Sequence, residues 1–171
     1  MIRSNILLIF IPDFFGLIFV LHAKHYIDIT MNKNGEIIII EDDEDDQFLL
    51  EEVFTALNYP NKRVYFEDGL TALEYLNAED VTPFIILSDI NMPKLNGLEL
   101  RNKIHTDAEL NLKCIPYLFF STAINQEVVI EAYSTSAQGF FIKQTSFDEL
   151  LDTIKVIMEY WNKCAAPGNF K

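Results

Sequence analysis

The chain contains 171 residues, half of them hydrophobic, and carries a formal net charge of −13. The apolar content excludes a disordered acidic tail, and the length fits one domain with a sizeable core. The negative charge argues against non-specific nucleic-acid binding, because phosphates repel such a surface. Two cysteines and three histidines are scattered without metal-ligand spacing, so no zinc site is expected.

The first thirty residues differ from the rest of the chain. Their formal charge cancels, and the apolar segment 5–23 is interrupted by Pro12, Asp13 and Gly16. Each uninterrupted piece is too short to span a bilayer. Three explanations stay open: an incorrectly assigned translation start with Met31 as the true start, a membrane-associated segment, or a structured extension. We expect an extension over 1–30, a folded domain over 31–162, a short tail over 163–171, and a cytoplasmic location.

From residue 36, short apolar runs alternate with segments of helical periodicity. Four consecutive isoleucines predict a strand that is buried on both faces, which is typical of a parallel sheet. Five such runs separated by candidate helices indicate an α/β fold: a doubly wound five-stranded parallel sheet with helices on both faces. The predicted strands are Ile37–Ile40, Val64–Phe66, Phe84–Leu87, Ile115–Phe120 and Phe140–Ile142.

Two of the candidate helices have recognisable ends. The segment 146–161 opens with Ser146 and Glu149 in a capping-box pattern and then repeats apolar residues at helical spacing. An earlier helix over residues 128–138 is predicted to end at Gly139, which would serve as its C-cap.

Polar side chains follow four of the five predicted strands. In parallel α/β sheets, functional sites lie at the carboxyl ends of the strands. This rule predicts that carboxylates, hydroxyls and one amine meet at a single edge of the sheet. The residues concerned are Glu41 and Asp42, Ser88 and Asp89, Ser121 and Thr122, and Lys143.

Four sequence segments together resemble a known family. "IIIIEDDEDD", "IILSDINMPKLNGLEL", "IPYLFFSTA" and "GFFIKQ" are similar, in order and spacing, to the motifs of bacterial response-regulator receiver domains. The resemblance covers about residues 35 to 162 and implies the flavodoxin-like strand order 2-1-3-4-5. It also implies two-component signalling, with a phosphoryl group received on an aspartate.

The resemblance assigns roles to individual residues. Asp89 takes the place of the phosphorylated aspartate, and Lys143 takes the place of the family's lysine. Ser121 matches the family's Ser/Thr position, with Thr122 as the alternative if the loop is shifted by one residue. Phe140 falls at the aromatic switch position. The implied ligands of Mg²⁺ are Glu41, Asp42, Asp89 and the backbone carbonyl of Asn91.

The chemistry explains why carboxylates gather after the first strand. A carboxylate that attacks a phosphoryl group is an anion meeting an anion, so a divalent cation is needed to neutralise charge. Mg²⁺ prefers hard oxygen ligands. The remaining acids, Asp43 to Asp46, lie where the first helix begins, and we interpret all four as capping and helix-dipole residues. If one of these four acids has a different role, we expect it to be Asp43.

One residue departs from the family pattern. Gln144 follows Lys143, where the family usually has proline after a cis peptide bond. A cis bond before a non-proline residue costs about 2.5–4 kcal/mol, so we expect a trans bond here. We therefore expect the residue at position 144 to affect the direction in which the Lys143 side chain points.

The site residues discriminate among several functions that this fold supports. The first is a receiver that accepts phosphate from a sensor histidine kinase or a histidine phosphotransfer protein and signals by contact with a downstream protein. Because only ten residues follow Trp161, we expect it to act without a fused output domain. A phosphohydrolase with an aspartyl nucleophile would have a second acid at position 91, so Asn91 argues against this function. A pseudo-receiver would bind partners without phosphorylation. A flavin-binding function is disfavoured, because the acids after the first strand would repel the flavin phosphate.

Overall fold

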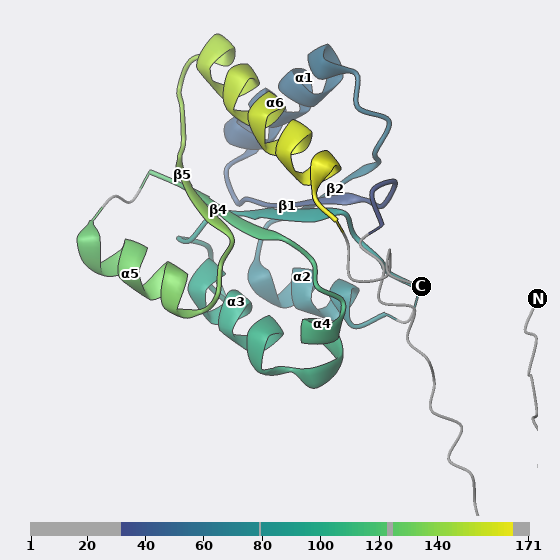
Figure 1. Cartoon of the computed structure of the whole chain (residues 1–171). Helices are drawn as coiled ribbons and strands as arrows, with labels where there is room; N and C mark the ends of the chain where they lie inside the picture. Colours follow the sequence, from purple (N-terminus) through teal and green to yellow (C-terminus); the bar gives the residue numbers. More distant parts are fainter. Residues whose placement is uncertain (1–31, 79, 123–124, 166–171) are drawn as a thin grey trace, which may run out of the picture.

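The computed structural model describes residues 32–78, 80–122 and 125–165. In this part of the chain, five strands form one parallel sheet in the order β2-β1-β3-β4-β5 (Figure 1). The predicted doubly wound α/β fold and its strand order are confirmed. The strands are β1 (Ile37–Ile40), β2 (Arg63–Phe66), β3 (Ile85–Ser88), β4 (Tyr117–Ser121) and β5 (Gly139–Ile142). The helices are α1 (Glu44–Leu57), α2 (Gly69–Leu76), α3 (Gly97–Thr106), α4 (Ala108–Leu112), α5 (Gln126–Ser134) and α6 (Phe147–Lys163).

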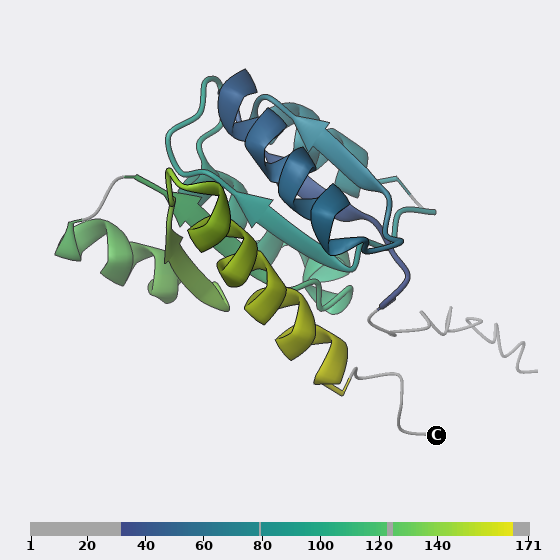
Figure 2. The same cartoon turned by 90° about the horizontal axis from the view of Figure 1, so that it is seen from above.

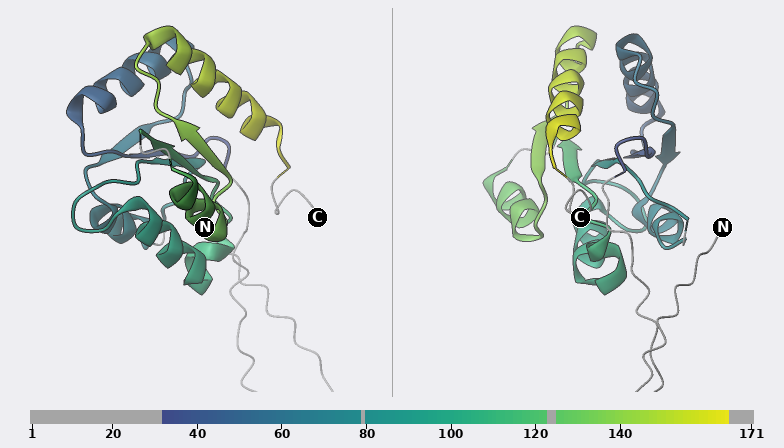
Figure 3. Two further views of the ribbon diagram at one scale, coloured as in Figure 1. Left: turned by 90° about the vertical axis from the view of Figure 1, so that its left-hand side faces the viewer. Right: turned by 45° about the vertical axis from the view of Figure 1, so that its right-hand side comes forward.

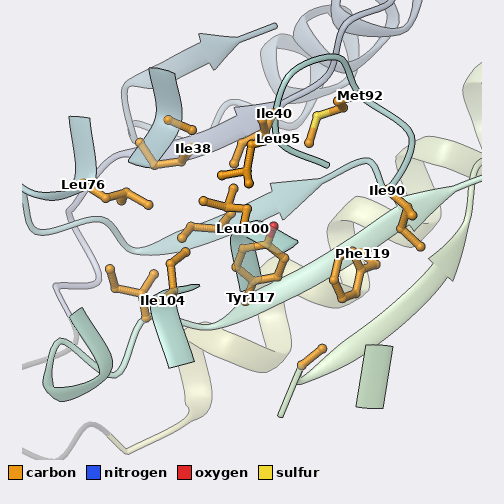
Figure 4. Close-up of a cluster of buried hydrophobic side chains, with 14 of the residues drawn as sticks. Ile38, Ile40, Leu76, Ile90, Met92, Leu95, Leu100, Ile104, Tyr117 and Phe119 are labelled. Atoms are coloured by element: carbon orange, nitrogen blue, oxygen red, sulfur yellow. The ribbon is translucent and has the colours of Figure 1, made fainter. Parts of the chain in front are cut away.

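The sheet separates two hydrophobic cores. Since successive strand residues point to opposite faces, the isoleucines of β1 contribute to both cores and are almost completely buried. Ile37 and Ile39 pack toward α1 and α6, which lie side by side on one face (Figures 2 and 3). Ile38 and Ile40 pack toward the helices of the other face, where Leu100 and Tyr117 join them (Figure 4).

The end of α5 differs from the prediction. The helix ends at Ser134, with Thr135 as its C-cap, and the left-handed backbone turn occurs at Ser136. Gly139 is therefore not a helix cap; the prediction was wrong, because Gly139 is the first residue of β5. A Cβ atom there would lie 3.0 Å from Leu118 Cδ2 and from Phe141 Cε2, which is a tight approach to two side chains that would have to shift slightly.

The last helix agrees with the prediction. Ser146 is the N-cap of α6, and its hydroxyl accepts from the Glu149 N–H at 3.3 Å. The same hydroxyl donates to Glu149 Oε2 at 2.9 Å, so the Glu149 side chain reaches the Ser146 hydroxyl where a capping box would use the Ser146 backbone N–H. Among the described residues, no helix is long and apolar enough to cross a membrane. Residues 1–30 lie outside the described part of the chain.

Candidate functional site

The predicted site residues come from the carboxyl ends of neighbouring strands. Glu41 and Asp42 directly follow β1, Asp89 follows β3, and Lys143 follows β5. Ser121 is the last residue of β4 and is completely buried, whereas Thr122 next to it is exposed. The Lys143 N–H donates to the Ser121 carbonyl at 3.1 Å, which joins the ends of β4 and β5. The parallel topology therefore brings these residues to one edge of the sheet.

Three carboxylates form a compact cluster at this edge. Glu41, Asp42 and Asp89 each offer an oxygen, and these oxygens lie within 4.8 Å of one another. Glu41 and Asp89 are buried, whereas Asp42 is exposed. Burial raises the pKa of Glu41 to about 7, although the adjacent Lys143 opposes this shift. The cluster thus combines hard oxygen ligands with more negative charge than the adjacent Lys143 neutralises.

Lys143 contacts a carboxylate from each of three elements. Its Nζ lies 2.6 Å from Glu41 Oε2, 2.7 Å from Asp46 Oδ2 and 3.4 Å from Asp89 Oδ2. An ammonium group has three N–H donors, so these acceptors match its full donor capacity. Burial lowers the pKa of Lys143, but hydrogen bonds to Asp46 and Glu41 outweigh burial and raise it above its ordinary value.

The backbone around Asp89 is held firmly. Its N–H donates to the Ile40 carbonyl at 2.8 Å, which continues the pairing of β1 with β3. Its carbonyl accepts from the Ser88 hydroxyl at 2.7 Å, and its Oδ1 accepts from the Ile90 N–H at 2.6 Å. The carboxylate is therefore presented by a fixed strand end and not by a loose loop. Asn91, two residues further on, is exposed.

The acids at the start of α1 have two different roles, which are helix capping and contact with Lys143. Asp43 is the N-cap, and its Oδ1 accepts from the N–H groups of Asp45 and Asp46 at 2.9 and 3.2 Å. Asp43 therefore has the capping role. Asp46 has the second role. It lies in the first turn of α1 and contacts Lys143, which is 97 residues away in the sequence. Sequence reasoning missed this contact, because helix-start chemistry already explains an acid at that position.

Phe140 and Gln144 lie on either side of Lys143 along the chain. Phe140 is half-buried in β5, and its ring centroid is 6.2 Å from that of Phe119. The Gln144 side chain donates to the Ile142 carbonyl at 3.3 Å. No peptide bond in the described ranges is cis, which agrees with the trans bond expected before Gln144.

Comparison with known proteins agrees with this architecture. Residues 37–155 match the family model for the response regulator receiver domain, and the chain belongs to this family. The chemotaxis protein CheY-3 of Vibrio cholerae is 30% identical over 129 residues, which cover 75% of this chain and 95% of that protein.

Two solved structures are also similar. The phosphorylated cyanobacterial phytochrome response regulator RcpA aligns with a TM-score of 0.70 and 29% identity, covering 78% of this chain and 99% of that chain. The Mn(2+)-bound form of response regulator Rcp1 aligns with a TM-score of 0.67 and 27% identity, with the same coverages. Rcp1 is from Synechocystis sp..

Proposed function

We propose that this receiver accepts a phosphoryl group on Asp89 and signals through phosphorylation-dependent protein contact. The observation that carries the proposal is the grouping of Asp89 with Lys143 and the acid pair Glu41 and Asp42 at one edge of the sheet. The similar RcpA structure is of a phosphorylated protein, which supports the same chemistry. The donor is a histidine kinase or a phosphotransfer protein, since receiver domains interact with such proteins.

The donor set fits a divalent cation with hard oxygen ligands. Lys143 contacts the carboxylates of Glu41, Asp46 and Asp89, and Asp42 adds a fourth carboxylate to the cluster, so the site has more negative charge than its one ammonium group can neutralise. Glu41, Asp42 and Asp89 would hold Mg²⁺, together with the Asn91 carbonyl that the family pattern adds. When bound, the ion supplies positive charge that offsets repulsion between the carboxylates and the phosphoryl oxygens.

The chain's own residues perform the remaining steps. A carboxylate oxygen of Asp89 attacks phosphorus while the bond to the donor imidazole breaks, and the imidazole keeps the bonding electron pair. Lys143 offers its ammonium group to a phosphoryl oxygen. Because its three donors already face carboxylates, the incoming oxygen must replace one of them. Asp46 is the most exposed of these partners, with 40% of its side chain accessible, so its contact is the least costly to give up.

Signalling then follows from a shift in population. Ser121 donates its hydroxyl to the phosphoryl group and draws its loop inward, and Phe140 changes its packing against Phe119. The added charge thereby favours one of two arrangements of the surface around β5. A neighbouring protein reads the altered surface.

The test measures phosphorylation directly. The full chain is incubated with Mg²⁺ and acetyl phosphate or phosphoramidate, and its intact mass is compared with that of Asp89→Asn. We expect a gain of one phosphoryl group that the variant does not show and that a chelator abolishes. No gain by the folded protein would favour a receiver that binds partners without phosphorylation. In that case Gln144→Pro, which restores the family's residue, becomes the next variant.

A further inference from the structure

A cavity lies at the opposite end of the sheet from Asp89. It has a volume of about 300 Å³ and is bordered by the segment that leads into β4. Helices α3, α4 and α6 and the residues before β5 contribute to its wall. The side chains that matter for its chemistry are Arg101, Ile104, His105, Leu110, Gln138 and Trp161. A volume of this size suits a small molecule.

Arg101 is a buried cation without a carboxylate partner. Only 4% of the residue is exposed, and none of the ion pairs found among the described residues includes it. Its Nη2 donates to the Ser136 carbonyl at 2.7 Å, and its guanidinium carbon lies 5.6 Å from the centre of the Tyr117 ring. Its Nε is buried and has no hydrogen-bond partner. Buried arginines are normally paired with acids, because an isolated buried charge is costly.

His105 adds a second unpaired group to the same cavity. It lies four residues after Arg101 on α3, so the two side chains share one helix face. Its Nδ1 is buried and also lacks a partner. Within residues 32–165, apart from the gaps at 79 and 123–124, Arg101 Nε and His105 Nδ1 are the buried side-chain nitrogen or oxygen atoms that lack a partner. Both belong to residues that line this cavity. Buried polar atoms are normally satisfied, so this coincidence points to a missing acceptor.

We propose that the cavity binds a small organic anion through its carboxylate or phosphate group. Guanidinium has only donors, and its planar fork matches the oxygens of these groups, so the group that satisfies it is an anion. His105 provides a second donor in the tautomer that carries the proton on Nδ1. Ile104, Leu110 and Trp161 provide apolar contact for the body of the molecule. The net charge of −13 disfavours anions elsewhere on the protein, so specificity arises from this buried cation.

The test uses nuclear magnetic resonance on the ¹⁵N-labelled full chain without Mg²⁺ or a phosphoryl donor. Benzoate and inorganic phosphate are titrated separately, and the Arg101 Nε–H resonance is followed with the backbone amides of His105, Gln138 and Ile90. We expect saturable shifts at Arg101, His105 and Gln138 and none at Ile90, which lies beside Asp89. Saturation by benzoate alone identifies a carboxylate ligand with an apolar body, and saturation by phosphate alone identifies a phosphate ligand. Saturation by neither overturns the proposal.

Variants separate the buried cation from general charge effects. Arg101→Met should weaken binding by about tenfold or more, because it removes the charged donor. Lys103→Met removes one positive charge from the exposed side of the same helix and should leave the affinity within about twofold. Equal affinities of wild type and Arg101→Met would overturn the proposal. If Arg101→Met does not fold, two other results decide the question. They are the Nε–H shift in the wild type and weaker anion binding by the His105→Leu variant. The outcome is independent of whether Asp89 is phosphorylated.

Discussion

Gly97→Ala is the substitution that should most directly disturb the backbone of Asp89. Gly97 is the first residue of α3, and its N–H donates to the Ile90 carbonyl at 2.9 Å. A Cβ atom at this position would lie 2.1 Å from the Asp89 carbonyl oxygen and 3.1 Å from Ile90 Cα. The glycine is therefore required by the close approach of α3 to the end of β3.

The size of the effect follows from this distance. Real Cβ contacts are essentially never shorter than 3.0 Å, so helix and strand end must separate by roughly 1 Å in a closely packed interior. The obstacle is backbone, which is fixed by the pairing of β1 with β3 and cannot rotate away. Overpacking of this kind costs about 1–3 kcal/mol of unfolding free energy. A displacement of about 1 Å at a reacting group lowers a rate by about 100-fold.

The assay combines urea unfolding with the initial rate of phosphoryl incorporation from acetyl phosphate. Gly139→Ala is the matched control, because its Cβ would meet Leu118 Cδ2 and Phe141 Cε2, which are side-chain atoms that can rotate. We expect Gly139→Ala to cost about 1 kcal/mol or less and to keep its phosphorylation rate. If Gly97→Ala kept both wild-type stability and wild-type rate, the close-approach argument would be refuted.

Three further predictions concern the site and its supports. Asp46→Asn should reduce the free energy of unfolding by less than about 1 kcal/mol and speed phosphorylation of Asp89 by up to about fivefold, because Lys143 loses a competing negatively charged partner. A slower time course by mass spectrometry would contradict this competition. Since burial raises the pKa of Glu41 to about 7, a proton occupies this ligand below that pH. Mg²⁺ affinity should then fall by about tenfold per pH unit below about 7, and an affinity that calorimetry finds independent of pH would exclude this role. Asp68→Ala removes the N-cap of α2, which accepts from two backbone N–H groups at 2.9 Å, and should cost about 0.5–2 kcal/mol in urea unfolding. Unchanged stability would show that the cap contributes nothing.

The number of strands, their order in the chain and the edge at which their carboxyl ends meet were predictable, because they depend on local pattern and topology. β-branched runs such as Ile37–Ile40 indicate strands, and parallel strands place their carboxyl ends at one edge. The convergence of Glu41, Asp89 and Lys143 followed from that rule alone, and the structure places them together. Strand limits were less accurate: β4 begins at Tyr117 and not at Ile115, because backbone pairing and not hydrophobicity sets where a strand begins.

The amino-acid sequence by itself determined the α/β fold, the family resemblance and the edge at which the polar residues meet. Only the tertiary structure decided which side chains touch: Asp46 reaches Lys143, Gly97 packs against Asp89, and Arg101 is buried without an acid. Hydrophobic periodicity is a property of neighbouring residues, so it can be read along the chain. Pairing between distant side chains depends on how helices pack against the sheet, and no local pattern in the sequence specifies that packing.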